Sequence, residues 1–151
     1  MAGSTITVKD NAGQLQAARD AKSPPELLGQ LAASPDETVR RSVAVRRDCP
    51  PAALARLAED RSSTVRYYVA QNRNCPPAAL EVLARDPEDG VRRRVAGRPD
   101  CPPAALGTLA ADSIPSIRLA VAGRLDCPPA ALEMLRQDAE PKVRRVARQR
   151  R

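Results

Sequence analysis

Residues 75–96 read CPPAALEVLARDPEDGVRRRVA, and the main features of this pattern recur at intervals of 26 residues. A cysteine followed by two prolines begins at Cys49, Cys75, Cys101 and Cys127, and Ser23 takes the cysteine's place one period earlier. Two leucine positions and a Val-Arg or Ile-Arg pair keep the same spacing. A fixed period of roughly 20–50 residues is typical of stacked repeat architectures. We therefore expect a solenoid of about five copies, at 23–48, 49–74, 75–100, 101–126 and 127–151.

Each copy predicts two short helices. The first begins at the double proline, because a proline at the first helical position lacks only an N–H that would be unpaired there anyway. Ser23 and Glu26 flank Pro24-Pro25 in the pattern of a capping box. This pattern places Ser23 at the N-cap of the helix, and it assigns the cysteines of the later copies to the same position.

Apolar residues at helical spacing mark the buried side of both helices. In the copy at 49–74, Leu54 and Leu57 line the first helix, and Val65, Val69 and Ala70 line the second. Helices of roughly ten residues are not stable alone in water. Neighbouring copies must therefore bury both apolar stripes.

The two ends of the repeat array differ from its middle. Residues 11–22 align with a second helix and predict an N-terminal cap helix, and residues 1–10 are expected to form a flexible tail. In the last copy, Arg136 and Arg148 replace alanines of the internal copies. Polar residues at such positions are typical of a terminal repeat with one face in water.

The unit Cys-Pro-Pro-x-x-Leu-x-x-Leu-Ala-x-Asp-x4-Val-Arg-x-x-Val-Ala resembles the leucine-rich repeat variant family over residues 23–151. That family is similar to HEAT repeats and other armadillo-type folds. The resemblance implies an all-α, right-handed superhelical solenoid in which α-helices alternate with short α- or 3₁₀-helices. Some members carry an N-terminal cysteine cluster for an iron–sulfur centre. No cysteine precedes Cys49, so we expect no cofactor in this chain.

The composition argues against an enzyme. The chain has no His, Phe or Trp, and its only aromatic residues are Tyr67 and Tyr68. Without histidine it lacks the commonest general base and the commonest metal ligand. A HEAT-like DNA glycosylase would need a carboxylate in an aromatic pocket, and the outward positions of the second helices offer no acid. We therefore expect no catalytic residues and no small-molecule substrate.

One cysteine per copy does not favour a metal site. Packed helices lie about 8–10 Å apart, which is too far for a disulfide or for thiolates that share one zinc ion. A helix N-cap lowers the pKa of a thiol, so reactive cysteines remain a minor alternative. The chain also lacks a membrane-spanning run and a signal-peptide pattern. We expect a cytoplasmic protein that neither spans nor binds a membrane.

The arginine of the Val-Arg pair lies on the buried side of the second helix and needs a partner there. The aspartate six residues earlier is the expected partner. The resulting ladder pairs Asp60 with Arg66, Asp86 with Arg92, Asp112 with Arg118 and Asp138 with Arg144. In the first copy Ser34 takes the place of the aspartate, so Arg40 is expected to reach a different group.

The outward positions of the second helices vary where the framework repeats. These candidate partner-binding residues are Arg41, Tyr67, Tyr68, Arg93, Arg94, Leu119 and Arg145. The net charge of +7 is concentrated in the second-helix segments. A basic edge of this kind attracts acidic protein surfaces or nucleic acid.

Two functions follow from this pattern. The leading hypothesis is a non-enzymatic scaffold that binds another protein with an acidic surface, centred on Tyr67, Tyr68, Arg93 and Arg94, because Tyr and Arg dominate interface hot spots. The alternative is sequence-independent nucleic-acid binding along the same edge. Scarce lysine and only two aromatic residues for base stacking disfavour that alternative.

Overall fold

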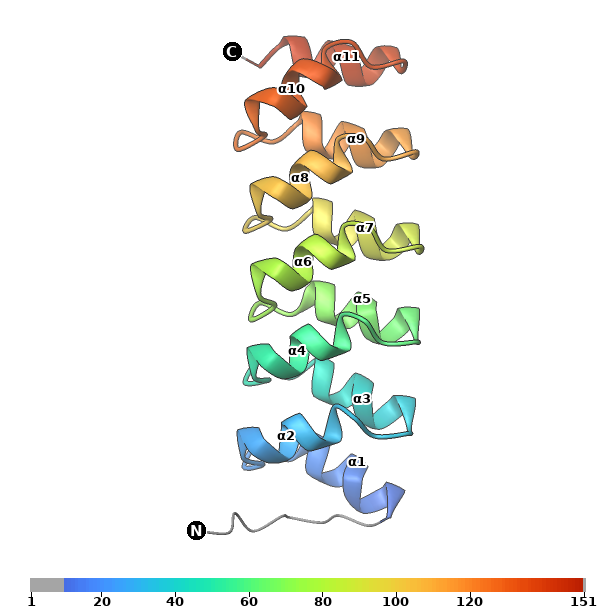
Figure 1. Ribbon diagram of the computed structural model, residues 1–151, viewed down its shortest axis with the longest axis vertical. Coiled ribbons are helices and arrows are strands. Elements are labelled where there is room, and N and C mark those ends of the chain that lie inside the picture. Colours follow the sequence, from blue (N-terminus) through green and yellow to red (C-terminus); the bar gives the residue numbers. More distant parts are fainter. Residues whose placement is uncertain (1–9, 151) are drawn as a thin grey trace. The chain divides into compact units, whose positions relative to one another are not determined.

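The computed structural model describes residues 10–150, which form eleven α-helices and no strand (Figure 1). The predicted all-α repeat architecture is confirmed. The chain divides into two compact units, Met1–Pro76 and Pro77–Arg151. The expected tail at residues 1–10 lies outside the described part of the chain, except for Asp10, which is the N-cap of the first helix.

Helices of two kinds alternate along the chain. The A helices are the first helices of each copy: α2 (Pro25–Leu31), α4 (Pro51–Leu57), α6 (Pro77–Leu83), α8 (Pro103–Leu109) and α10 (Pro129–Leu135). The B helices are α1 (Asn11–Arg19), α3 (Glu37–Ala44), α5 (Ser63–Gln71), α7 (Asp89–Ala96), α9 (Pro115–Ala122) and α11 (Pro141–Arg148). All are α-helices, so neither kind takes the 3₁₀ form that the family resemblance allowed.

The two kinds of helix form two layers within each unit. In the first unit α3 packs between α1 and α5, while α2 and α4 form the other layer. In the second unit α9 packs between α7 and α11, and α6, α8 and α10 lie side by side. None of the described helices has the length and apolarity needed to cross a bilayer.

Proline places the start of each A helix one residue later than the capping-box pattern predicted. The second proline of each pair is the first helical residue, and in the four cases with a described cap the first proline is the N-cap. Ser23 therefore lies before the N-cap, and its Oγ donates to the carbonyl of Ala17 at 2.6 Å. The capping-box prediction is wrong, because Pro24 already provides the extended backbone that an N-cap requires.

The core lies between the layers and is aliphatic. Leu54, Leu57, Val65, Val69 and Ala70 are fully buried, as their spacing predicted. Full burial of one such leucine or valine contributes about 1.5–3 kcal/mol. The A helices have seven residues each, and tertiary packing rather than helix propensity must stabilise helices this short.

Candidate functional site

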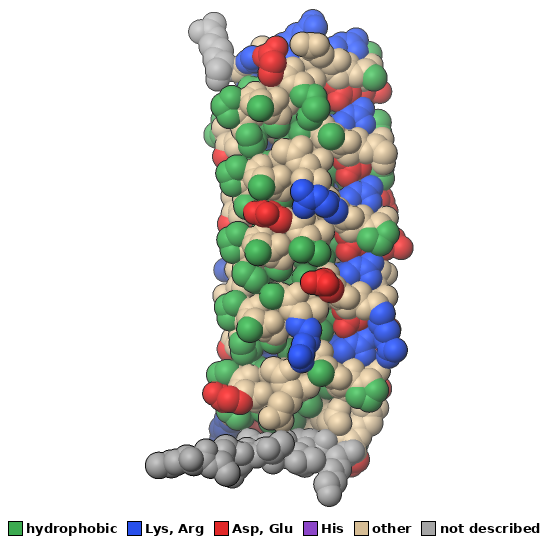
Figure 2. Space-filling model, viewed as in Figure 1, with side chains coloured by type: hydrophobic (Ala, Val, Ile, Leu, Met, Phe, Trp, Pro, Cys, Tyr) green, Lys and Arg blue, Asp and Glu red, His purple; other side chains and the backbone are tan. Residues whose placement is uncertain are grey.

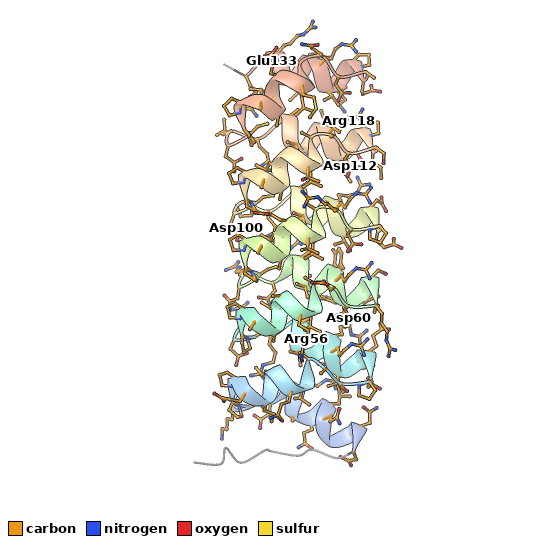
Figure 3. All side chains as sticks on the ribbon, viewed as in Figure 1. Arg56, Asp60, Asp100, Asp112, Arg118 and Glu133 are labelled. Atoms are coloured by element: carbon orange, nitrogen blue, oxygen red, sulfur yellow. The ribbon has the colours of Figure 1, made fainter. Side chains whose placement is uncertain are left out.

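The buried arginines of the B helices form ion pairs that point forward along the chain. In the first unit Nε of Arg40 donates to Oδ2 of Asp60 at 2.6 Å, and its second terminal nitrogen donates to Oδ1 at 3.0 Å. Both side chains are only 6% exposed. In the second unit the same two-bond geometry joins Arg92 to Asp112 and Arg118 to Asp138. Figure 3 labels Asp60, Asp112 and Arg118.

The predicted pairing within one copy is therefore wrong for the carboxylates. The arginine does contact the residue six positions earlier, but it donates to that residue's backbone carbonyl. These bonds join Arg66 to Asp60, Arg92 to Asp86, Arg118 to Asp112 and Arg144 to Asp138, at 2.6–2.7 Å. Arg40 likewise donates to the carbonyl of Ser34 at 2.8 Å. Each guanidinium in a described forward pair thus joins its own loop to the next copy.

The aspartates are held from a second side. Each accepts a hydrogen bond from the backbone N–H two residues later, at the start of the next B helix: Asp60 from Ser62, Asp112 from Ile114 and Asp138 from Glu140. This turn fixes the carboxylate so that it faces the preceding copy. Spacing along one helix could not reveal that orientation.

Hydrogen bonding sets the protonation state of these carboxylates. Burial raises the pKa of Asp60, but the bonds from Arg40 and from the N–H of Ser62 lower it by more. Burial likewise raises the pKa of Asp112, but the bonds from Arg92 and from the N–H of Ile114 lower it by more. For Asp138, the hydrogen bond from Arg118 is the largest effect and holds the pKa below its usual value. The ladder is therefore ionised at neutral pH.

A second row of contacts, which the sequence analysis missed, joins the ends of the B helices. Arg124 donates to the backbone carbonyls of Ala96 and Arg98, at 3.0 and 2.6 Å, and forms a two-bond ion pair with Asp126. Arg46 and Arg98 form the same pair with Asp48 and Asp100. The signal was present as Arg-x-Asp before each of these Cys-Pro-Pro sequences.

One member of this row is replaced by a matched pair of residues. In the copy at 49–74, Asn72 and Asn74 stand where the others have arginine and aspartate. The Nδ2 of Asn72 donates to the carbonyls of Ala44 and Arg46, both at 2.7 Å. The backbone contact is thus kept, while the cation and its counterion are lost together.

These pairs decide which positive charges face solvent. Among the described residues, Arg41, Arg47, Arg73, Arg94 and Arg145 form no ion pair and lie outside both rows. Within each unit, Figure 2 shows basic and acidic side chains alternating on the side where A helices lead into B helices, and hydrophobic side chains gathering over the A helices. The basic edge therefore has fewer available arginines than the number of arginines in the B helices suggests.

Three of the candidate residues lie on the B helices of the first unit. Tyr67 is 38% exposed, and Tyr68 is half-buried with its ring edge-to-face against that of Tyr67, at 5.8 Å between centroids and 81° between planes. Tyr68 and Arg41 line one hollow of about 580 Å³, to which α1, α3 and α5 all contribute. Ala18, Arg19, Val45 and Arg46 complete most of its wall, and none of these four was among the sequence candidates.

The remaining candidates lie in the second unit. Arg93 is exposed but already bonded, to Asp89 at 3.0 Å and to Oγ of Ser116 at 2.7 Å. Arg94 and Arg145 are exposed, and Leu119 is half-buried. Arg94 is therefore freer than Arg93 to contact a partner.

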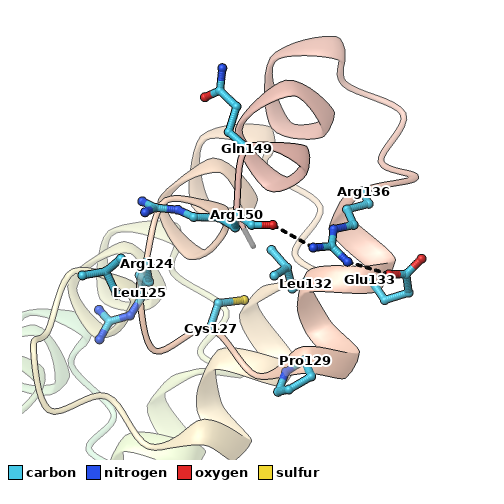
Figure 4. A pocket seen from close by; sticks show the side chains of 9 residues that line it. All are labelled: Arg124, Leu125, Cys127, Pro129, Leu132, Glu133, Arg136, Gln149 and Arg150. Carbon is cyan, nitrogen blue, oxygen red and sulfur yellow. Dashed lines mark hydrogen bonds and ion pairs between the residues drawn. The ribbon is translucent and has the colours of Figure 1, made fainter.

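The second unit has its own hollow, of about 670 Å³, between α10 and the end of α11 (Figure 4). Cys127 and Leu132 line it, with Arg136 at its edge. Arg136 donates to Glu133 at 3.0 Å and to the carbonyl of Arg150 at 2.8 Å. The cations around this hollow are thus held by internal contacts.

The cysteines lie in environments that suppress reactivity. Each Sγ whose contacts are fully described lies 3.8–3.9 Å from the carbonyl of the following proline. Burial raises the pKa of Cys49 to about 12 and that of Cys101 to about 11. The N-cap argument for a lowered pKa fails, because Cys49, Cys101 and Cys127 each precede the N-cap. Among residues 10–150, no three His, Cys, Asp or Glu side chains come together as metal ligands do.

The repeat unit is also recognised by comparison. Residues 64–88 and 89–114 match, as two adjacent copies, the family model described as leucine rich repeat variant. Two adjacent copies of this chain, over residues 64–114, are thus similar to leucine rich repeat variant repeats. The first matched segment covers α5 from its second residue and all of α6, and the second covers α7 and α8. No curated protein and no solved structure matches the chain significantly. Leucine rich repeat variant repeats are helical repeats, which typically serve as non-catalytic protein-interaction scaffolds.

Proposed function

We propose that this chain is a non-catalytic scaffold that binds another protein through the outward side of its B helices, which we name the B face. In the first unit the B face comprises Arg41, Val45, Tyr67 and Tyr68. The observation that carries the proposal is the position of the two tyrosines. They are the only aromatic residues of the chain, and both lie on the B face, one of them at a hollow.

The chemistry of the B face suits a protein partner. Tyrosine and arginine are enriched in interface hot spots, where a large side chain next to a pocket excludes water from the contact. Arg41 has no acidic partner among the described residues, whereas Arg40, Arg92 and Arg118 of the ladder are each paired with an aspartate. An acidic partner surface would complement the charge that remains.

Nucleic-acid binding is the second candidate, and the unpaired arginines Arg47, Arg73, Arg94 and Arg145 favour it. Phosphate contacts by such residues would make binding steeply dependent on salt. Aromatic stacking would add little, because Tyr67 and Tyr68 already pack against each other. We expect random duplex DNA to bind no tighter than about 10⁻⁶ M at physiological salt, the tight limit of non-specific binding.

Affinity capture from the native host, repeated after nuclease treatment, tests the proposal. The protein captured by the wild-type chain is then produced separately, and its binding is measured directly. We expect Tyr67→Ala or Tyr68→Ala to weaken that binding by about 2 kcal/mol or more. Val82→Ala is the matched control, because Val82 is exposed on an A helix. Binding that disappears with nuclease treatment, or that Val82→Ala weakens as much, would contradict the proposal.

A further inference from the structure

The hollow between α1, α3 and α5 combines an apolar wall with unpaired cations. Ala18 is fully buried beneath it, and Tyr68 contributes a half-buried ring. Val45 is 51% exposed at its edge. An exposed valine next to a tyrosine at a hollow is an apolar surface that water solvates poorly.

The repeat framework does not require these apolar residues. The positions that correspond to Val45 in the other copies hold Gln71, Gly97, Gly123 and Gln149. Those that correspond to Tyr68 hold Ser42, Arg94, Ala120 and Val146. Since the fold accepts small or polar residues at both positions, the apolar pair in the first unit has no structural cause in the repeat.

The cations at the hollow differ in their availability. Arg46 is held by Asp48 and by the carbonyls of Ala18 and Asp20. Arg19 and Arg41 have no ion pair or side-chain hydrogen bond among residues 10–150. A guanidinium with free donors binds a carboxylate through two parallel hydrogen bonds. The hollow therefore offers an apolar wall and two available carboxylate-binding groups.

We propose that this hollow is a recognition pocket for an acidic peptide segment of the partner protein. One apolar side chain of that segment packs against Val45 and Tyr68, and a carboxylate binds Arg41 and Arg19. Val45 is the C-cap of α3, four residues after Arg41, and its helical backbone puts the two Cβ atoms about 5–6 Å apart. In an extended peptide, residues two positions apart are separated by about 6.5 Å. The pocket thus recognises a peptide in which an apolar residue and an Asp or Glu lie two positions apart. This inference rests on the proposed protein-binding function and names the segment that the B face takes.

A phage-displayed library of random short peptides, selected on the full chain, tests this pocket. We expect selected peptides to share an apolar residue and an acid at that spacing. Val45→Gln introduces the residue that two other copies carry, so it preserves the fold, and it should weaken binding of a selected peptide about tenfold, or about 1.4 kcal/mol. Arg41→Gln should have a similar effect. Arg47→Gln removes the same charge outside the hollow and should leave binding within about twofold, or roughly 0.4 kcal/mol.

Three outcomes would overturn the inference: selection without enrichment, selected peptides that lack the acid, and equal binding by Val45→Gln and wild type. A random single-stranded oligonucleotide that displaces the peptide at equal concentration would assign the hollow to phosphate and overturn it as well. Each leaves the proposed function separately testable. If binding of a captured partner depends on Tyr67 but not on Val45 or Arg41, the proposal that the B face binds a protein stands, and only the proposed pocket is refuted.

Discussion

Arg118 on α9 holds the carboxylate of Asp138, twenty residues further along the chain, with Nε at 2.7 Å from Oδ2. The same guanidinium donates to the backbone carbonyl of Asp112, six residues before it. One side chain therefore joins the loop that starts its own B helix to the loop that starts the next. In this arrangement the ladder is a set of contacts between copies. Removing one of its ion pairs should therefore weaken the interface between two neighbouring copies.

The forward pairing predicts which side chains are energetically coupled. Arg118→Ala should destabilise the protein by about 3 kcal/mol, because it leaves the carboxylate of Asp138 buried without its cation. A double-mutant cycle should give a coupling of about 1–3 kcal/mol between Arg118 and Asp138. The coupling between Arg118 and Asp112 should be clearly smaller.

Urea unfolding measures these free energies, and Arg94→Ala is the control. Arg94 is exposed and outside the ladder, so its loss should change stability by less than about 0.5 kcal/mol. A larger coupling to Asp112 than to Asp138 would mean that the pairing runs within each copy.

The ladder also predicts acid sensitivity. The pKa values of Asp60, Asp112 and Asp138 are lower than usual in the folded protein. Their contribution to stability is therefore complete above the unfolded pKa of about 3.9, and it is lost as the pH falls through the lower folded pKa. Arg40→Met with Asp60→Leu removes one pair without leaving a buried charge. Urea unfolding between neutral and acidic pH should show a smaller loss of stability in this double variant than in the wild type; an equal loss would refute the role of the pair.

The repeat length, the helix order and the buried stripes were all predictable from the chain. Leu54, Leu57, Val65 and Val69 follow local helical spacing, and a 26-residue period repeats that spacing. Local spacing also placed the ladder arginines on the buried side. It could not choose between an aspartate six residues before and one twenty residues after, because that choice depends on how the copies stack.

The hollow of the first unit was also only partly predictable. Arg41 and Tyr68 were candidates because they vary between copies, whereas Arg19 belongs to α1, which is not a full copy. Three helices at different positions in the sequence bring these residues together. Helical spacing within one copy contains no signal for that arrangement.

The Asn72–Asn74 pair predicts a dependence between two positions. The single variant Asn72→Arg adds a cation next to the amide of Asn74. The double variant Asn72→Arg with Asn74→Asp creates an ion pair equivalent to the one between Arg46 and Asp48. Asp48 is 56% exposed, so the pair is a partly solvated one. The double variant should be more stable than the single variant by about 0.5–1 kcal/mol in urea unfolding. Equal stability of the two would show that the residues at 72 and 74 act independently.

Burial should order the reactivity of the thiols. The thiolate is the reactive form, and burial raises the pKa of Cys49 to about 12 and that of Cys101 to about 11. Cys127 is less buried than either. Alkylation of the native protein, followed by peptide mass spectrometry, should modify Cys127 before Cys49 and Cys101. In urea all should react alike. Native modification of Cys49 as fast as Cys127 would contradict the burial of that thiol.

The most direct test of the proposed function is calorimetric titration of the purified partner with single variants of the B face. We predict that binding energy is concentrated, with Tyr67→Ala or Tyr68→Ala costing about 2 kcal/mol or more. Arg94→Ala and Arg145→Ala should each cost much less. The contrary result is a similar loss from every arginine variant, little effect of either tyrosine, and random duplex DNA that binds tighter than about 10⁻⁶ M with an affinity that falls about 10³–10⁵-fold between 50 and 200 mM salt. That pattern would assign the B face to nucleic acid and not to a protein.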